Sequence, residues 1–115
     1  MSHPVIHWEI GGRDGVKMAR FYEDLFGWNA QPAGGGYWLI PPELPGIGGG
    51  LLQTEDPIPP HVTIYVQVED LEATLDHAAL LGGRIVSAPV PIPGIGRVAL
   101  FEDSEGNLIG LLETS

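Results

Sequence analysis

The sequence predicts an α+β fold made of two βαβββ modules with a largely antiparallel sheet. The order of a strand, a helix and further strands occurs twice, and three short strand candidates follow each helix, which favours hairpins over parallel crossovers. The two halves also share one spacing. Aligning Asp14 with Asp70, 56 positions further on, also aligns Gly27 with Gly83. We therefore interpret the chain as two copies of one module.

The first strand is predicted over residues 4–10, where apolar and polar side chains alternate. One face carries Ile6, Trp8 and Ile10, and the other carries His7 and Glu9. Because the helix of each module offers apolar side chains, we expect the apolar face of the strand to contact the helix. The polar face should then line a cavity.

A helix is predicted between Asp14, a typical N-cap residue, and Gly27, a typical C-terminal signal. Its apolar stripe consists of Met18, Phe21, Tyr22 and Leu25. Gly-rich breaks and a Pro/Gly loop at 41–50 then separate a short strand at 37–40 from a second one at Leu51-Leu52. These segments complete the first module.

The second module starts with a strand from His61 to Val68. We expect one of its faces to be apolar and the other to carry the hydrogen-bonding side chains of His61, Thr63, Tyr65 and Gln67. Asp70 should cap a helix that ends at Gly82-Gly83. Three strands are expected after it, at Arg84–Ser87, Arg97–Glu102 and Asn107–Glu113, the last two joined by a turn at Gly106.

Length and composition restrict the function. The 115 residues fit one domain, residues 1–115, with modules at about 4–54 and 60–115. The absence of cysteine excludes disulfides, thiolate metal sites and a cysteine nucleophile. Five basic against fifteen acidic side chains give a net charge of −10, so we expect neither nucleic acid nor a membrane as partner. With no apolar run of ~18 residues and no signal peptide in Met1–Ile10, a cytoplasmic location is expected.

Several motifs resemble the vicinal oxygen chelate superfamily, which contains glyoxalases, bleomycin-resistance proteins and extradiol dioxygenases. In the first module the resemblance rests on His7–Asp14 and on Ala19–Trp28, which is similar to the family's helix ending in Phe-Tyr-x-x-Leu-Phe-Gly-Trp. In the second module it rests on Val68–Leu71, Leu81–Gly83, Ile92–Arg97 and Asp103–Asn107, as in glyoxalase-like members without an assigned reaction. The resemblance implies paired βαβββ modules whose sheets curl around a cavity, and it does not by itself imply a reaction.

The resemblance also implies four metal-ligand positions, two in each module. His7 lies seven residues before Asp14, at the first-strand ligand position, but the same offset from Asp70 gives Thr63. The last-strand position of the second module is Gly110, and the first module offers only Gly48–Leu51 there. Because catalytic metal sites typically use three protein ligands, we predict no conventional metal and no cofactor. A relocated site made of His7, Glu9 and His61 remains an alternative.

Candidate site residues follow from the predicted cavity face. Glu9 and His7 are the candidates for proton transfer, because a carboxylate and an imidazole in a desolvated pocket can have suitable pKa values. The ligand-binding candidates are His7, Glu9, Trp38, His61, Thr63 and Tyr65. Trp38 would either cap a pocket or fill the core, and Glu9 would otherwise pair with a base such as Arg97.

Three functions are compatible with these residues. The first is a glyoxalase-like small-molecule protein, a metal-independent lyase or isomerase that uses proton transfer. The second is a bleomycin-resistance-type protein that sequesters a drug or metabolite without catalysis, and the charge of −10 would suit a cationic ligand. The third is a metal-dependent lyase or dioxygenase with relocated ligands. We expect a polar or cationic small-molecule ligand and a two-fold symmetric homodimer.

Overall fold

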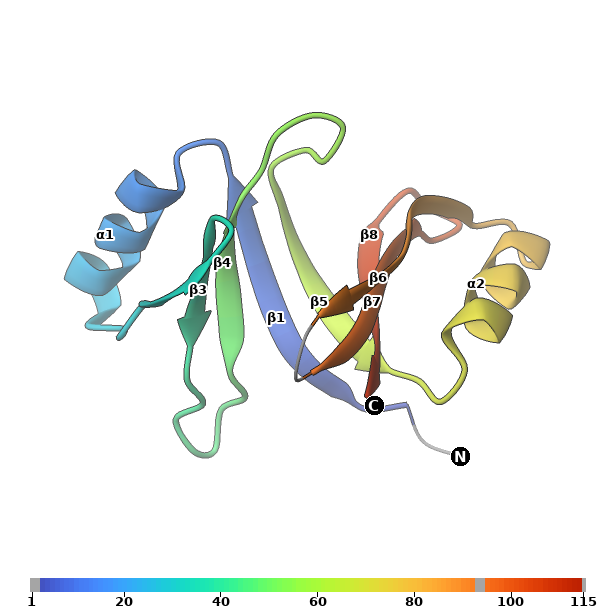
Figure 1. Ribbon diagram of the computed structural model, residues 1–115, viewed down its shortest axis with the longest axis horizontal. Helices are drawn as coiled ribbons and strands as arrows, with labels where there is room; N and C mark the ends of the chain where they lie inside the picture. The colour runs from blue at the N-terminus through green and yellow to red at the C-terminus, as the bar shows by residue number, and fades with distance from the viewer. Residues whose placement is uncertain (1–2, 93–94, 115) are drawn as a thin grey trace. The chain divides into compact units, whose positions relative to one another are not determined.

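The computed structural model describes residues 3–92 and 95–114. Its internal contacts divide the chain into two compact units: the first unit is residues 7–62, and the second unit is residues 63–114 together with 3–6. Among the described residues the elements follow the order βαβββ twice (Figure 1), which confirms the predicted α+β class and its modules. Pro93 and Gly94, which belong to one of the second-module motifs, lie outside the described residues.

The first unit combines one helix with four strands. In chain order they are β1 (Val5–Gly12), α1 (Gly15–Phe26), β2 (Gln31–Gly34), β3 (Tyr37–Ile40) and β4 (Gly49–Gln53). The strand order is β2-β3-β4-β1, with β1 parallel to β4 and the other pairs antiparallel. The parallel pair is the physical reason for the helix, since parallel neighbours need a crossover between them.

The second unit repeats this arrangement. Its elements are β5 (His61–Gln67), α2 (Leu71–Leu80), β6 (Arg84–Ile92), β7 (Gly96–Glu102) and β8 (Leu108–Thr114). The strand order is β5-β8-β7-β6, and β5 runs parallel to β8. His61 and Val62, at the start of β5, belong to the first unit.

Both helices begin where the sequence predicts. The carboxylate of Asp14 accepts a hydrogen bond from the Lys17 N–H at 3.1 Å, and that of Asp70 accepts one from the Ala73 N–H at 3.0 Å. The C-terminal ends differ. Gly27 ends α1 in the left-handed conformation, with φ of 71°, whereas α2 stops at Leu80 and the positive φ falls on Gly82.

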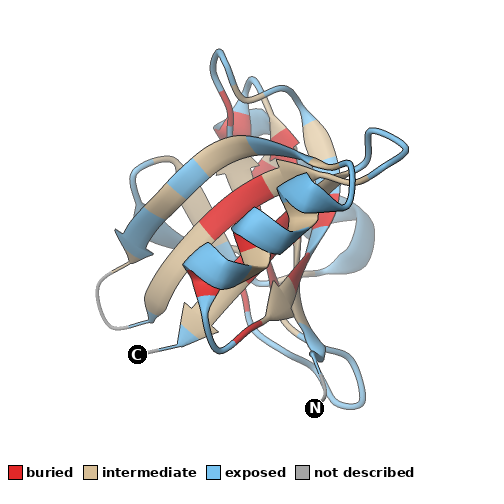
Figure 2. Ribbon diagram, turned by 90° about the vertical axis from the view of Figure 1, so that its right-hand side faces the viewer, coloured by how far each residue is buried: buried red, intermediate tan, exposed pale blue. Residues whose placement is uncertain are grey.

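Each helix covers one face of its own sheet. In the first unit α1 packs through Ala19 against Ile40 and Leu51, and Trp8 and Ile10 of β1 join this cluster. In the second unit α2 packs through Leu71 and Leu75 against strand residues, Val68, Ala99 and Leu111. Figure 2 shows α2 across the strands, with exposed residues on its outer side. The apolar faces of the first strands therefore contact the helices where those helices cover them.

Two expected packing details are wrong. Phe21 and Leu25 of the predicted apolar stripe are more than half exposed, so α1 contacts the sheet mainly through Ala19, Met18 and Tyr22. On β5, Val66 and Val68 pack on the α2 cluster, but Val62 is 76% exposed. The helix covers only one end of the strand, because α2 follows directly after that end.

Two edge strands differ from the prediction for the same reason. The predicted module requires three strands after α1, but the sequence pattern located only two of them and not β2. In the second module β6 extends to Ile92 instead of stopping at Ser87. Both contain proline and lie last in their strand order, where a missing N–H costs no ladder hydrogen bond. Register shifts within β6 further accommodate its prolines.

Candidate functional site

Strand β1 separates the candidate site from the α1 core by simple alternation. Trp8 and Ile10 contact the α1 cluster, so His7 and Glu9 leave the strand on the opposite face. Glu9 is 3% exposed and His7 is half-buried. A buried carboxylate requires a partner, and the partner defines the site.

Glu9 pairs with His61, which is in the same unit. Its Oε2 atom lies 2.8 Å from His61 Nε2, and both side chains are 5% exposed. The other ring nitrogen, Nδ1, lies 2.8 Å from the Pro59 carbonyl oxygen. Because a carbonyl oxygen only accepts, Nδ1 carries a proton that it donates to Pro59. The contact between Nε2 and Oε2 therefore holds one proton, on the nitrogen or on the oxygen.

The pKa of His61 indicates where this proton lies. The hydrogen bond to Glu9 raises the pKa of His61, although burial of the ring acts against the shift. The Glu9 carboxylate thus favours the protonated form of the His61 imidazole. Glu9 and His61 constitute a buried, hydrogen-bonded ion pair whose imidazole orientation is fixed by Pro59.

His7 forms a second hydrogen-bonded pair, with Tyr37 of β3. His7 Nε2 lies 2.7 Å from the Tyr37 hydroxyl. Burial lowers the pKa of His7, with the charge of Glu9 opposing, and burial together with that charge raises the pKa of the Tyr37 phenol. Both groups are therefore neutral at pH 7, and each can donate a hydrogen bond.

Sequence reasoning missed Tyr37 and selected its neighbour Trp38. In β3 Trp38 is paired with Leu51, which is fully buried in the α1 core, and the Trp38 ring lies against Gly15 at the start of α1. The structure therefore does not bring Trp38 together with His7 and Glu9. Since all four residues of β3 are apolar or aromatic, the sequence offered no alternation that could assign its faces.

A glycine makes room for the tyrosine. In the register of β1 with β4, Glu9 is opposite Gly50, and a Cβ atom at Gly50 would overlap the Tyr37 hydroxyl. The same relation occurs in the second unit. There Tyr65 is opposite Gly110, and a Cβ atom at Gly110 would overlap the Tyr65 ring. In each unit a tyrosine ring thus occupies the space that a side chain on the last strand would need.

Thr63 and Tyr65, which belong to the second unit, are both buried. The Thr63 hydroxyl donates a hydrogen bond to the Leu108 carbonyl oxygen of β8. Thr63 takes the position equivalent to His7, and Tyr65 the position equivalent to Glu9, by the spacing of 56 residues. The polar row of β5, Thr63 and Tyr65, therefore offers hydroxyl groups. The polar row of β1, His7 and Glu9, offers an imidazole and a carboxylate at the equivalent positions.

The residues present do not fit the metal site that the family resemblance implies. Of its four positions only His7 offers a strong ligand, and tyrosine rings fill the space at Gly50 and Gly110. The relocated set does not converge either. Within residues 3–92 and 95–114, His7, Glu9 and His61 are not among the groups whose potential ligand atoms lie within 4.8 Å of one another.

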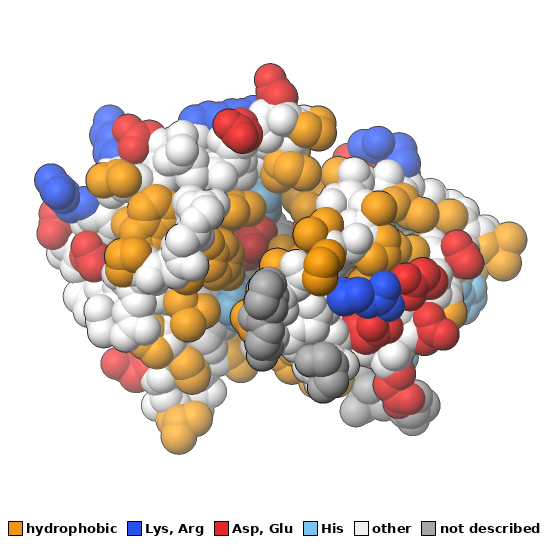
Figure 3. Space-filling view, viewed as in Figure 1, with side chains coloured by type: hydrophobic (Ala, Val, Ile, Leu, Met, Phe, Trp, Pro, Cys, Tyr) orange, Lys and Arg blue, Asp and Glu red, His pale blue; other side chains and the backbone are white. Residues whose placement is uncertain are grey.

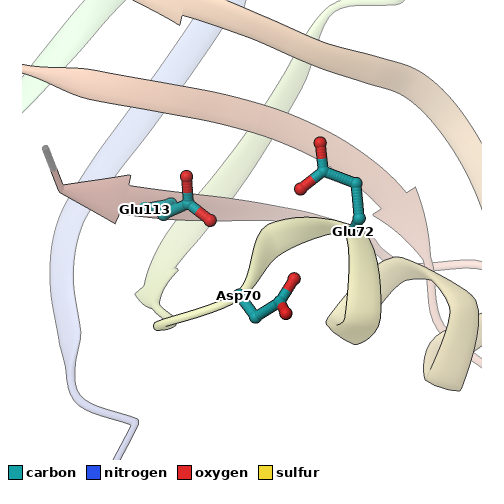
Figure 4. Close-up of side chains that lie close together, drawn as sticks. All are labelled: Asp70, Glu72 and Glu113. Carbon is teal, nitrogen blue, oxygen red and sulfur yellow. The ribbon is translucent and has the colours of Figure 1, made fainter.

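Three carboxylates near the start of α2 do have oxygen atoms within 4.8 Å of one another (Figure 4): those of Asp70, Glu72 and Glu113. Two of these three carboxylates already have a basic partner. Arg97 contacts Glu72 at 2.6 Å and Glu113 at 2.7 Å, and Glu113 also accepts the Leu71 N–H. The bond from Arg97 lowers the pKa of Glu72 to about 2. The group anchors the helix to β8, so Arg97 pairs with Glu72 and Glu113 and not with Glu9.

Helices of the described part of the chain are too short or too polar to cross a membrane.

Comparison with known proteins gives a consistent result. The chain is 30% identical over 97 residues to CFP32 of Mycobacterium tuberculosis, which has a provisional glyoxylase name, with 81% of this chain and 37% of that protein covered. It is 26% identical over 116 residues to the anthracycline biosynthesis protein DnrV of Streptomyces peucetius, covering 85% and 42%. The chain thus spans less than half the length of these two relatives.

The fold matches solved structures of the same type. A glyoxalase/bleomycin resistance protein/dioxygenase superfamily member from Vibrio splendidus superposes with a TM-score of 0.65 at 15% identity, covering 99% of this chain and 100% of that one. Methylmalonyl-CoA epimerase from Mycobacterium tuberculosis gives 0.62 at 21% identity, covering 96% and 87%. The model of the Glyoxalase/Bleomycin resistance protein/Dioxygenase superfamily matches residues 5–111. The chain therefore belongs to this superfamily, as its motifs predict.

Proposed function

We propose that this protein binds a small molecule and catalyses metal-independent proton transfer, as an isomerase or lyase, at the face of β1 that carries His7 and Glu9. The observation that supports this most directly is the Glu9–His61 pair. Removing two ionised groups from water is costly, and buried titratable groups of this kind cluster at functional sites. A carboxylate held ionised in a protected position is suited to act as a general base.

The two hydrogen-bonded pairs can divide the work. Glu9 accepts a proton from a carbon next to a carbonyl group, and the electron pair of the broken C–H bond moves to the carbonyl oxygen. Tyr37 and His7, both neutral, donate hydrogen bonds to the negative charge that develops there. Return of the proton to the same or a neighbouring atom completes an isomerisation. His61 acts as a positioning residue that orients the Glu9 carboxylate through its 2.8 Å contact.

Thr63 and Tyr65 remain predicted ligand contacts in this proposal, whereas Trp38 belongs to the α1 core. The ligand is a polar or cationic small molecule. We also propose a cytoplasmic homodimer. The exposed apolar side chains of α1, among them Phe21 and Leu25, support self-association. Light scattering should give a mass of twice 12.3 kDa, and the mass of one chain at micromolar concentration would contradict the dimer.

Two NMR measurements test the proposal. Without any substrate, ¹H–¹⁵N spectra at pH 7 should show His61 protonated on both ring nitrogens and His7 on one. With substrate, a neutral or cationic carbonyl compound that has a C–H bond next to its carbonyl group should exchange that proton for deuterium in D2O containing EDTA. Glu9→Gln should abolish this exchange, and the exposed control Glu105→Gln should retain it. Exchange that disappears with EDTA and returns with a divalent metal would refute the metal-independent mechanism.

Binding without catalysis is the second candidate function. It is favoured by the fact that Glu9 is already engaged by His61, which would leave it a structural anion. In that case the compound would bind, but no deuterium exchange would occur. Glu9→Gln would lower the affinity for a cationic ligand, and there would be no exchange rate to change.

A further inference from the structure

A concavity lies in the first unit, on the side of β1 opposite to Glu9. It has a volume of about 600 Å³, and its walls come from β1, the end of α1 and the segment 40–47. The β1 residues in its wall are Trp8 and Ile10, which alternate with Glu9, so their side chains point to the other side of the strand. Small-molecule sites typically measure roughly 300–1,000 Å³, so the pocket has the size of a ligand site.

Aromatic rings form one wall of this pocket. The ring centroid of Trp28 lies 5.1 Å from that of Trp8 and 5.0 Å from that of Phe26. The Trp8 ring lies over Gly49, where a Cβ atom would overlap it, and its Nε1–H donates to the Ile47 carbonyl oxygen at 3.3 Å. The ring is thus held in place by its surroundings. In Figure 3 hydrophobic side chains gather on the visible face of the unit that contains α1.

The wall of the pocket also carries a negative charge. Glu43 is the only ionisable residue in its wall as the structure describes it. Among the described residues no basic side chain pairs with Glu43, and Arg13, on the same unit, pairs with Asp56 instead. A carboxylate beside indole faces, in a chain of net charge −10, attracts cations and repels anions.

We propose that this pocket binds a flat aromatic cation, independently of the proton-transfer site. Indole and phenyl faces favour a planar ring by stacking and a positive charge by cation–π attraction. Glu43, at the rim of the pocket, supplies the counter-charge. The ligand class is a fused aromatic ring that carries a protonated amine.

Proflavine, a planar aromatic cation, is a suitable probe, with anthraquinone sulfonate as the anion of similar shape. Isothermal titration should show one proflavine site per chain, with binding at least tenfold weaker for the sulfonate. Glu43→Gln should weaken proflavine binding about 2- to 5-fold, because one exposed charge pair contributes about that much to affinity. Trp28→Leu should weaken it about 5- to 30-fold. Glu105→Gln, at an exposed carboxylate that does not line the pocket, should change nothing.

Three results would overturn this inference. The first is equal binding of proflavine and the sulfonate, and the second is an equal effect of Glu43→Gln and Glu105→Gln on proflavine binding. The third is that the wild-type protein binds no proflavine and is self-associated by light scattering, while Ile47→Glu makes it monomeric. The last result would assign the pocket to a second copy of the chain. Because Glu43 is exposed, Glu43→Gln gives an answer even if Trp28→Leu fails to fold. Glu9→Gln should bind proflavine normally, which separates failure here from failure of the proposed catalysis.

Discussion

The polar faces of β1 and β5 offer a direct comparison between the two units. Both strands pair in parallel with the last strand of their module, and in both a glycine, Gly50 or Gly110, is opposite the key position. That key position is Glu9 in the first unit and Tyr65 in the second. The backbone arrangement is therefore the same, and the chemistry differs.

The two polar faces differ in the hydrogen-bond partners of their side chains. Glu9 and His7 have side-chain partners from distant segments, His61 and Tyr37. Thr63 instead donates to a backbone carbonyl of the adjacent strand. Pairs of side chains can exchange and store protons, whereas a hydroxyl bound to a carbonyl oxygen only fixes structure. The comparison shows that a duplicated backbone supplies two equivalent positions, and that the side chains at these positions have different kinds of hydrogen-bond partner.

The largest expected effect separates the two rows by activity. Glu9→Gln keeps the shape of the side chain and removes its charge, so the rate of deuterium exchange should fall by about 10²–10⁴ if Glu9 is the base. Tyr65→Phe, at the equivalent position, should alter ligand affinity more than rate. A loss of rate in Tyr65→Phe as large as that in Glu9→Gln would show that both rows are reactive.

The next effect concerns stability. His61→Ala leaves the buried Glu9 carboxylate without its partner and should lower the free energy of unfolding by roughly 3–5 kcal/mol in urea titrations. Thr63→Val, which leaves only the Leu108 carbonyl unpaired, should cost about 1–3 kcal/mol. The double variant Glu9→Gln/His61→Ala should recover part of the first loss. If His61→Ala costs no more than Thr63→Val, the ion pair has no special role in the fold.

The two histidines should give the stability opposite pH dependences. His61 has a raised pKa when folded, so its contribution is complete below the unfolded value of 6.5 and is lost as the pH rises through the folded pKa. His7 has a lowered pKa, so stability is lost as the pH falls below 6.5 through its folded pKa. Urea titrations between pH 5 and 9 should show that His61→Gln removes the alkaline decline and His7→Gln the acidic one. Thr63→Val should retain both.

The smallest effect compares two buried threonines. Thr63 has its hydroxyl bonded, whereas the Thr54 hydroxyl is buried without a hydrogen-bond partner among the described residues. Thr54→Val should therefore raise the free energy of unfolding by about 1 kcal/mol, while Thr63→Val lowers it. Destabilisation by Thr54→Val would indicate that its hydroxyl has a partner, such as a bound water molecule.

Local signals in the sequence were sufficient for the helices and the first strands. Asp14 and Asp70 cap their helices through their own side chains, and alternation in residues 4–10 correctly predicted that Trp8 and Ile10 contact the α1 core. Ile6, which the same alternation placed on that face, does not join this cluster. Local signals did not predict the proline-containing edge strands, because proline is typical of loops. They also did not assign the two faces of β3, because β3 has no alternation of polar and apolar residues. Those segments depend on neighbouring strands and not on their own pattern.

The sequence by itself determined the βαβββ duplication, the family, and the candidates Glu9 and His7, because caps, glycines and alternation act over a few residues. Only the tertiary structure decided which partners these candidates have. His61 lies 52 residues from Glu9 and Tyr37 lies 30 residues from His7, so both contacts depend on strand register and on the space left by Gly50. A side chain's partner, and with it the pKa, is set by distances across strands, which no short-range pattern in the chain encodes.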